Sequence, residues 1–416
     1  MKSDLIQLTK ASKQAARSLA KLNTDQKNNL LSSISEELII NQQEILNENL
    51  KDIQNGKEKG LSSAMLDRLL LNPDRIKGMA NALREVVELP DPVGKTSNER
   101  TRPNGLHIGM MSIPLGVIAI IYEARPNVTS DAAGLCLKSG NAVILRGGSE
   151  AFNSNIAIVN ALHKGIEKCN VDPSIITFVP TTDREAMIEL LKLDEYIDLV
   201  IPRGGEGLIR FVSENSRIPV IKHYKGVCHL YVDRNADIKM AVNILIDGKT
   251  SRPGVCNALE TLLIHKDVSA EFLPLAYEEM KKRNVEIRGC EKTKSILPEV
   301  VDAKEEDYGY EFLDLILAAK VVDNYEEAVA HIERYGSDHT EVIITENNDT
   351  AQRFVKDINS SSVMVNASSR FADGGEMGLG AEIGISTTKL HAYGPMGLEA
   401  LTTKKFVVTG KGQTRH

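Results

Sequence analysis

The sequence predicts an α/β protein with more than one lobe, and three observations support this class. A chain of 416 residues is longer than one ordinary hydrophobic core organises. From Pro114 onward, short apolar segments of strand length alternate with segments of helical periodicity, as in a parallel sheet covered by helices. Glycine-rich turns follow several of these segments, which is typical of α/β sheets that bind ligands at the carboxyl ends of their strands. We therefore expect two α/β lobes.

The first part of the chain, about 90 residues, has helical spacing and predicts amphipathic helices. Thr24 and Asp25 are the expected helix cap between two such runs. The apolar positions with this spacing are Leu5, Leu8, Ala11, Ala15, Leu19 and Leu22, then Leu30, Ile34, Leu38, Ile45 and Leu50. Residues 89–94, rich in proline, end the pattern, and residues 98–112 are polar and strand-like, so we expect a β excursion there.

A nucleotide-binding lobe is predicted over residues 113–226. The expected strands are residues 117–122, 142–145, 175–179, 197–201 and 219–222, with helices over 155–168 and 183–191. Glycine-rich turns at residues 146–150 and 202–207 would let a phosphate approach backbone amides. Neither turn fits G-x-G-x-x-G or the P-loop pattern, so simple tight turns remain an equal alternative.

A second α/β segment is predicted from Asp233. We expect a helix over 238–246 and strands over 261–265, 316–322 and 341–345, followed by a glycine-rich stretch at 378–384. Residues 405–409 resemble an isolated strand near the end of the chain.

Composition excludes several classes of protein. The net charge of −7, with only 4% aromatic residues and no basic block, argues against a nucleic-acid-binding surface. No apolar run approaches the length of a membrane span, and the first residues lack a secretory signal. Five scattered cysteines without C-x-x-C spacing argue against a disulfide framework and a metal site. We expect a cytoplasmic protein that binds neither membrane nor metal.

Cys256 is the candidate nucleophile. It follows proline and glycine in residues 251–257, which predicts a sharp turn, and the nearby Lys249 and Arg252 would favour the thiolate. An inert loop cysteine is the equal alternative on the residues alone. The remaining cysteines have simpler interpretations: Cys136 and Cys228 as core residues, Cys169 and Cys290 near the ends of elements.

A nucleotide lobe followed by a cysteine on a loop resembles the aldehyde dehydrogenase superfamily over nearly the whole chain. Residues 251–260 and the stretch from Val322 to Glu341 are similar to two motifs of the gamma-glutamyl phosphate reductase family within it. Three further similar segments, at residues 113–117, 123–127 and 138–146, occur in the expected order.

The resemblance implies a fold and a domain organisation. It implies an aldehyde dehydrogenase-like α/β fold, with a Rossmann-type cofactor lobe, an α/β catalytic lobe and a small β oligomerisation element. The expected domains are a cofactor-binding domain (1–97 and 113–226), a catalytic domain (227–398) and the oligomerisation element (98–112 and 399–416). A homodimer or homotetramer is expected, since an exposed sheet edge invites association.

The resemblance also implies an activity: NADPH-dependent reduction of L-glutamyl 5-phosphate to L-glutamate 5-semialdehyde with release of phosphate, a step of proline biosynthesis. It implies that Cys256 is the nucleophile and that Asn127 donates to the oxyanion. The implied NADPH-binding residues are Arg146, Gly147, Gly148, Ser149, Gly204, Gly205 and Glu311. The implied substrate-binding residues are Arg125, Arg252, His223, Ser386 and Thr387. A transient contact with glutamate 5-kinase is a further expectation.

One segment departs from the ordinary aldehyde dehydrogenases. Those enzymes carry a glutamate before a Gly-Gly pair, which activates water to hydrolyse the thioester, whereas residues 222–226 read Lys-His-Tyr-Lys-Gly. A reductase that must keep water from its thioester is expected to lack that base.

Several alternatives remain open. The chain could reduce another acyl phosphate, or be a catalytically silent nucleotide-binding relative. Lys249 could be a solvated surface charge, and His223 and His339 could be structural histidines instead of acids. The hydroxyls after the glycine-rich stretch, at residues 386–388, could cap a turn.

Overall fold

The computed structural model describes residues 2–415 and divides into two compact units. Unit 1 comprises the chain up to Lys222, Leu379–Gly384 and the chain from Met396 onward. Unit 2 comprises His223–Gly378 and Ile385–Pro395. The chain therefore passes from one unit to the other four times, and each unit contains its own sheets.

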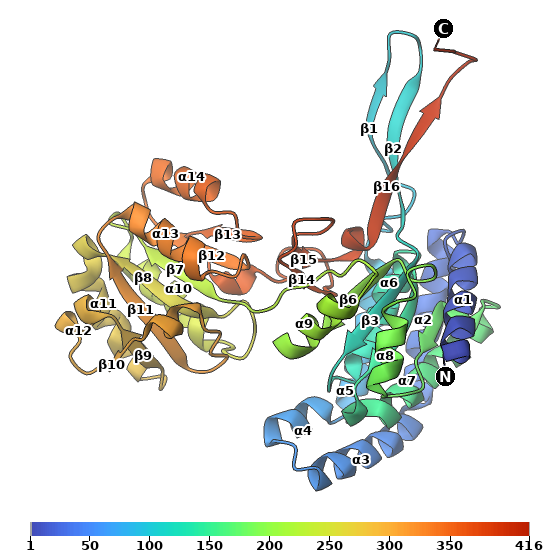
Figure 1. Cartoon of the computed structure of the whole chain (residues 1–416), viewed down its shortest axis with the longest axis horizontal. Helices are drawn as coiled ribbons and strands as arrows, with labels where there is room; N and C mark the ends of the chain where they lie inside the picture. Colours follow the sequence, from blue (N-terminus) through green and yellow to red (C-terminus); the bar gives the residue numbers. More distant parts are fainter. Residues whose placement is uncertain (1, 416) are drawn as a thin grey trace. The chain divides into compact units, whose positions relative to one another are not determined.

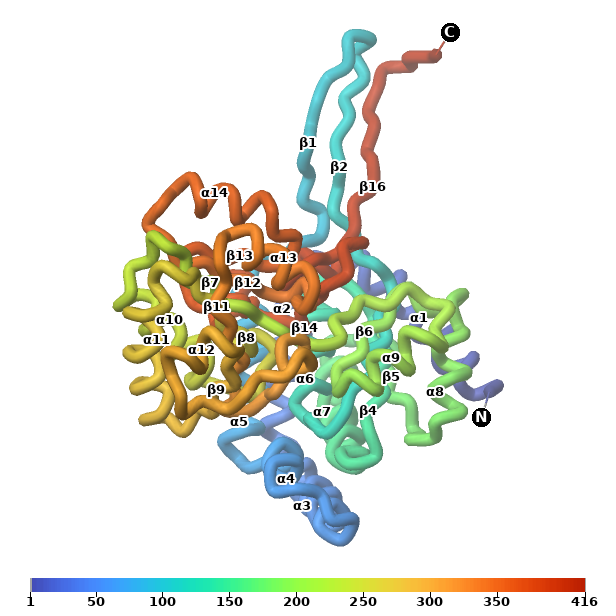
Figure 2. The backbone as a smooth tube through the Cα atoms, turned by 60° about the vertical axis from the view of Figure 1, so that its left-hand side comes forward, coloured from blue at the N-terminus to red at the C-terminus, as the bar shows by residue number. Residues whose placement is uncertain are grey.

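Unit 1 begins with five helices. They are α1 (Lys2–Leu19), α2 (Thr24–Ile40), α3 (Gln42–Glu58), α4 (Ser63–Leu69) and α5 (Pro73–Glu88). The predicted cap at Thr24 and Asp25 is wrong by one residue, because the Asn23 side chain accepts from Gln26 N and the Gln26 side chain accepts from Asn23 N. This reciprocal capping box fixes where α2 starts. Helices α3 and α4 lie side by side in both backbone views (Figures 1 and 2).

A four-stranded parallel sheet in the order β5-β4-β3-β6 forms the core of unit 1. Its strands are β3 (Val117–Tyr122), β4 (Ala142–Gly147), β5 (Ile176–Phe178) and β6 (Leu199–Arg203). The connecting helices are α6 (Asn127–Lys138), α7 (Phe152–Lys168), α8 (Arg184–Leu190) and α9 (Glu206–Asn215). The strand predicted over 219–222 is wrong: only an isolated bridge joins Val220 to Val200. The other predicted strands of this lobe are confirmed within two residues at each end.

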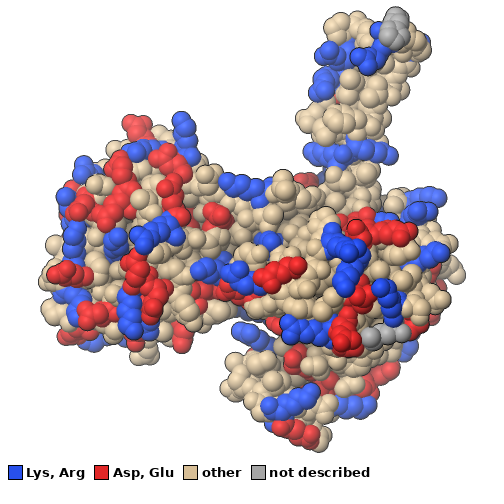
Figure 3. Space-filling view, in the orientation of Figure 1, with Lys and Arg blue, Asp and Glu red and all other residues tan. Residues whose placement is uncertain are grey.

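The two strand-like outliers pair with each other. Strands β1 (Thr96–Thr101) and β2 (His107–Pro114) form an antiparallel hairpin, and β16 (Thr402–Thr409) adds to the other edge of β2. This three-stranded sheet extends away from the rest of unit 1 (Figure 1). Lysine and arginine are more evident on its surface than acidic residues (Figure 3). Phe406 and Val408, on one face of β16, are 66% and 56% exposed.

Unit 2 is built on a seven-stranded sheet in the order β10-β9-β11-β8-β7-β12-β13. The strands are β7 (Cys228–Val232), β8 (Leu259–His265), β9 (Glu286–Gly289), β10 (Val301–Asp302), β11 (Ile316–Val322), β12 (Thr340–Ile344) and β13 (Ser362–Val365), all parallel. Its helices are α10 (Ile238–Thr250), α11 (Lys266–Lys281), α12 (Glu291–Ile296), α13 (Tyr325–Tyr335) and α14 (Asn348–Asp357). Short strands β14 (Gly384–Ser386) and β15 (Gly394–Met396) accompany the last unit crossings.

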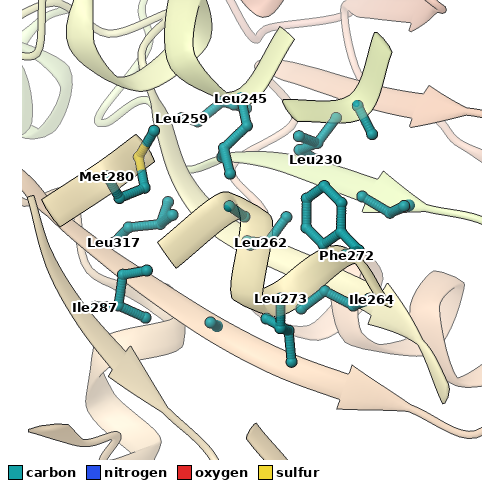
Figure 4. Close-up of a cluster of buried hydrophobic side chains, with 14 of the residues drawn as sticks. Leu230, Leu245, Leu259, Leu262, Ile264, Phe272, Leu273, Met280, Ile287 and Leu317 are labelled. Carbon is teal, nitrogen blue, oxygen red and sulfur yellow. The ribbon is translucent and has the colours of Figure 1, made fainter. Parts of the chain in front are cut away.

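The core of unit 2 fills one face of this sheet. Leu230, Leu262, Ile264 and Leu317 from the strands meet Phe272, Leu273 and Met280 from α11 (Figure 4). All seven side chains are fully buried. Burial of this kind stabilises the folded state by about 1.5–3 kcal/mol for each large apolar side chain. The sheet therefore holds the loops at its edge in fixed positions.

None of the helices within residues 2–415 is both long and apolar enough to cross a membrane. The same residues contain no cluster of three or more histidine, cysteine, aspartate or glutamate side chains arranged to hold a metal ion.

Candidate active site

Cys256 lies on the loop that joins α10 to β8 in unit 2, within a turn closed by the bond from Ala258 N to Val255 O (3.0 Å). The turn predicted from proline and glycine is thus confirmed. Cys256 is partly exposed, whereas Cys136 and Cys228 are fully buried as predicted. Cys169 and Cys290 lie at the C-cap of α7 and the N-cap of α12.

The loop is held from behind by its neighbour Asn257. The Asn257 side chain donates to Ala372 O (2.9 Å), and the Ser369 hydroxyl donates to Asn257 O (2.7 Å). Asn257 is almost fully buried. The residue after the cysteine therefore fixes the loop to the segment 369–372, while the cysteine remains accessible.

The start of β7 approaches the cysteine backbone closely. A β-carbon added at Gly226 would lie 1.9 Å from the carbonyl oxygen of Cys256. This is a steric clash, so any other residue here would displace the backbone. The Cys228 thiol donates to the same oxygen (3.2 Å). Gly226 is therefore required by close approach, a role that its place in a five-residue motif did not reveal.

Glu311, predicted to hold the nicotinamide ribose, is part of the same neighbourhood. Its carboxylate accepts from Gly226 N (2.8 Å), and the Ser337 hydroxyl accepts from Val227 N (2.8 Å). A carboxylate thus does lie next to the cysteine loop, although residues 222–226 contain none. The structure gives Glu311 a role in anchoring the backbone beside Cys256.

The second sequence motif, from Val322 to Glu341, spans the end of β11, α13 and the start of β12. Glu341 accepts from both the backbone and the ring of His229 (3.0 and 2.9 Å), with both side chains fully buried. Burial raises the pKa of Glu341. These contacts tie β12 to β7, the strand that supports the cysteine.

Two of the predicted histidines lie close together. The rings of His223 and His339 are 5.9 Å apart, edge to face. Burial, and then the neighbouring His223, lower the pKa of His339 to about 3, so this ring is neutral at physiological pH. His339 contacts Cys228 Sγ (3.7 Å) and Thr340 Oγ1 (2.9 Å), which favours the structural interpretation of His339.

The two basic neighbours of Cys256 differ. Arg252 is exposed on the cysteine loop. Lys249 is fully buried and forms an ion pair with Glu260 (2.7 Å), so the interpretation of Lys249 as a solvated surface charge is wrong. Burial lowers the pKa of Lys249 and raises that of Glu260 to about 7. Lys249 instead joins the end of α10 to β8.

The hydroxyl candidates lie where the chain enters unit 2 for the second time. Ser386 is buried, and its hydroxyl accepts from Thr388 N (3.1 Å), which is the turn-capping arrangement left open by the sequence. Thr387 is partly exposed.

The carboxyl ends of β3, β4 and β6 carry the predicted cofactor residues in unit 1. Glu123, after β3, accepts from Gly205 N (2.9 Å), and a β-carbon at Gly204 would lie 2.3 Å from the same carboxylate oxygen. Gly205 is the N-cap of α9. Gly148 is the N-cap of the 3-10 turn Ser149–Ala151. Gly148 and Gly205 therefore lie at two element N-termini at one edge of the sheet, where backbone N–H groups favour phosphate, although the N–H of Gly205 itself is taken by Glu123.

Arg146 lies beside these glycines, and only part of the hydrogen-bonding capacity of its guanidinium group is used. Its Nη2 donates to Thr182 O (2.7 Å), while its buried Nε has no partner within residues 2–415. Burial lowers the pKa of Arg146, against the opposing effect of Glu150, Glu123 and Asp183. A guanidinium with an unused buried N–H at the end of a parallel strand fits a phosphate-bearing cofactor.

Asn127 is the first residue of α6 and is exposed, as is Arg125 in the preceding turn. The turn contains Ala124 at φ 34°, a strained value for a non-glycine residue. Asn127 Nδ2 donates to Asp131 Oδ2 (2.8 Å). Sequence reasoning missed Asp131, although its place four residues after Asn127 puts both on one face of the helix.

The chain matches the aldehyde dehydrogenase family over residues 1–307. It is 60% identical over 404 residues to a gamma-glutamyl phosphate reductase of Salinibacter ruber, covering 97% of this chain and 93% of that protein. It is 57% identical over 402 residues to the gamma-glutamyl phosphate reductase of Xanthomonas oryzae pv. oryzae, covering 97% of both chains.

Solved structures give the same result. The crystal structure of gamma-glutamyl phosphate reductase from Thermotoga maritima matches with a TM-score of 0.98 and 47% identity, covering 99% of this chain and all of that one. An acetylating aldehyde dehydrogenase from Geobacillus thermoglucosidasius, 16% identical, matches with a TM-score of 0.70 over 100% of this chain and 98% of its own length, which supports the fold alone.

Proposed function

The chain belongs to the aldehyde dehydrogenase family and, within it, to the gamma-glutamyl phosphate reductases, and from this membership we propose that it reduces L-glutamyl 5-phosphate to L-glutamate 5-semialdehyde with release of phosphate. This places the protein in proline biosynthesis. The observation that carries the proposal is Cys256, accessible on a loop whose backbone is fixed by Gly226, Asn257 and Ser369. A rigid loop with an accessible thiol suits nucleophilic attack on an acyl phosphate.

In the proposed reaction, Cys256, Asn127 and the nicotinamide cofactor each have a separate role. The Cys256 thiolate attacks the acyl carbon, phosphate leaves, and a thioester remains on the sulfur. Asn127 donates a hydrogen bond to the oxygen that becomes negative during the attack. When bound, the reduced nicotinamide supplies the hydride that converts the thioester to the aldehyde level, and Cys256 then departs as the thiolate.

Members of this family use a nicotinamide cofactor, and we propose NADPH for this chain. Support comes from the Nε of Arg146, which has no partner within residues 2–415 and lies next to Gly147, Gly148 and Ser149. The element N-termini at Gly148 and Gly205 are a second support. Arg146 would hold the extra phosphate of NADPH, and Gly204 with Gly205 would admit the pyrophosphate. We assign the ribose of the nicotinamide to Glu311.

Unit 1 would accordingly bind the cofactor and unit 2 would carry the nucleophile. We assign the acidic and phosphate groups of the substrate to Arg125 and Arg252, with His223, Ser386 and Thr387 as further substrate contacts. We also propose a cytoplasmic homo-oligomer that associates through the β1–β2–β16 sheet and contacts glutamate 5-kinase transiently.

The proposal is tested in the reverse direction, by following reduction of NADP with L-glutamate 5-semialdehyde and phosphate. Cys256→Ala should abolish activity because no other group forms the thioester. Cys169→Ala, which removes another partly exposed cysteine, is the matched control and should keep wild-type activity. Wild-type activity in Cys256→Ala would overturn the mechanism.

The same assay without phosphate separates a reductase from a hydrolytic dehydrogenase. We expect the wild-type reaction to stop without phosphate, because residues 222–226 lack the carboxylate that activates water in the hydrolytic dehydrogenases. Continued turnover in phosphate-free buffer would favour hydrolysis, with Glu311 as the candidate base. A faster rate with aspartate 4-semialdehyde would indicate another acyl phosphate.

A further inference from the structure

The amide of Asn127 is held by a carboxylate one turn further along α6. Asn127 Nδ2 donates to Asp131 Oδ2 at 2.8 Å, and the Ser130 hydroxyl lies 3.5 Å from Asp131 Oδ1. A side-chain amide nitrogen carries two hydrogens. One of them is taken by Asp131, and the other remains for a second acceptor.

The turn before α6 places Asn127 at the N-terminus of the helix. Ala124, at φ 34° in the turn between β3 and α6, is buried and strained. Strain of this kind persists where the surrounding structure demands it. The turn brings Asn127 to the first position of α6, where the positive end of the helix favours a developing negative charge.

The charge on Asp131 decides which way the amide faces. Burial raises the pKa of Asp131 to about 6, and Asn127, Ser130 and Arg203 act in the opposite direction. The carboxyl is therefore ionised at pH 7.5. An ionised carboxylate only accepts hydrogen bonds, so it attracts the nitrogen of the Asn127 amide and repels its oxygen. A flipped Asn127 would present an oxygen, not an N–H, to the reacting group.

We propose that Asp131 is a positioning residue, which holds the Asn127 amide so that its second N–H is presented to the oxygen that becomes negative in the reaction. This rests on the proposed function, in which Asn127 is the oxyanion donor. Because that bond strengthens only as charge develops, a misoriented amide slows turnover with little effect on substrate binding.

The central variant is Asp131→Asn, which keeps the shape but removes the charge and so permits both orientations of Asn127. We expect kcat to fall about 5- to 50-fold, a part of the roughly 100- to 1000-fold loss that removal of the donor itself causes, while the KM for the semialdehyde changes less than about twofold. Asp131→Ala should behave similarly, and alanine favours the helix, so this second variant is expected to fold.

A double-mutant cycle tests whether Asp131 acts through Asn127. In an Asn127→Ala background, Asp131→Asn should change kcat by less than about twofold, because the group it positions is gone. Asp52→Asn is the matched control: Asp52 also accepts from an asparagine amide, that of Asn153, at 2.8 Å in unit 1. It should keep the wild-type kcat, and circular dichroism should confirm the helical content of every variant.

The outcomes separate the positioning role of Asp131 from the oxyanion role of Asn127 and from the proposed function. Unchanged kcat in both Asp131 variants would overturn the positioning role while leaving the proposed function intact. An equal loss in wild-type and Asn127→Ala backgrounds would show that Asp131 acts independently of Asn127. Wild-type kcat in Asn127→Ala itself would remove the oxyanion assignment, and the inference with it, whereas the Cys256 and phosphate tests would still stand or fail separately.

Discussion

At the scale of single residues, the position of Cys256 depends on a neighbour with no side chain. Gly226 touches the cysteine carbonyl, Glu311 accepts from Gly226 N, and the Cys228 thiol donates to the same carbonyl. Nothing in these contacts depends on glycine flexibility, since what matters is the space that a β-carbon would fill. The nucleophile is positioned through its backbone, so changes there should affect turnover more than stability.

Gly226→Ala should therefore reduce kcat by about 100-fold, since displacing a reacting group by roughly 1 Å commonly has that effect. Gly78→Ala is the control, because a β-carbon at Gly78 in α5 meets no atom within 4 Å and should raise stability by about 0.5–1 kcal/mol without changing kcat. The measurements are steady-state kinetics and the thermal midpoint. Wild-type kcat in Gly226→Ala would mean that the loop tolerates the displacement.

At the scale of elements, the loop between α10 and β8 is anchored at both ends. The buried pair Lys249–Glu260 joins the last turn of α10 to the second residue of β8, and Leu313 N donates to the other oxygen of Glu260 (3.1 Å). Two buried charges are expensive to desolvate, but each neutralises the other. The pair fixes how far apart the two elements lie, and hence the span of the cysteine loop.

Lys249→Met should lower the free energy of unfolding by about 3–5 kcal/mol, because it leaves Glu260 buried without its partner. Adding Glu260→Leu should recover much of this loss. Lys281→Ala, which breaks an exposed pair with Glu299, is the control and should cost under about 1 kcal/mol. Urea denaturation followed by circular dichroism measures all three, and an equal loss for the exposed and buried pairs would contradict the argument.

Most elements were predictable because their signals are local. Short, nearly continuous apolar runs identified β3 and β11, and the hydrophobic spacing of α1 and α2 marked them as helices. The supposed strand over 219–222 failed because one apolar run pairs with the sheet at Val220 alone. The Asn23 cap was missed because Thr and Asp follow it immediately, and all three residue types cap helices.

For the site too, features carried by consecutive residues could be predicted and contacts between distant segments could not. Motif resemblance proposed Cys256, Asn127 and the glycines, since these are read from consecutive residues. It did not reveal the burial of Lys249, because a lysine is usually solvent-exposed, although its place four residues after buried Leu245 puts it on the buried face of α10. Contacts between distant segments, such as Gly226 with Cys256 or Asn257 with Ala372, have no local signal at all.

At the scale of the molecule, the β1–β2–β16 sheet is the element best suited to association. Its outer strands β1 and β16 have edges unpaired within residues 2–415, and Phe406 with Val408 exposes apolar surface on one face. Unpaired edges and apolar patches are features that soluble proteins usually cover. A second copy of the chain is the proposed cover.

Phe406→Lys combined with Val408→Lys should dissociate the proposed oligomer, because it places two charges where apolar surface would be buried. Light scattering coupled to size-exclusion chromatography gives the mass directly. Leu50→Lys, on exposed surface of α3, is the control and should leave the mass unchanged. A wild-type protein that is monomeric at micromolar concentration would contradict the oligomer proposal, and an unchanged oligomer in the double variant would locate the interface elsewhere.

The pairing of β2 with β16 has a consequence for synthesis of the chain. The register from Thr402↔Pro114 to Thr409↔His107 joins segments separated by the four-stranded sheet of unit 1 and by all of unit 2. At about 5–20 residues per second, a ribosome needs roughly 15–60 s to make the intervening chain of about 290 residues. During that interval one edge of β2 has no partner strand, so the nascent protein is most exposed to misassembly with other chains until β16 has been made.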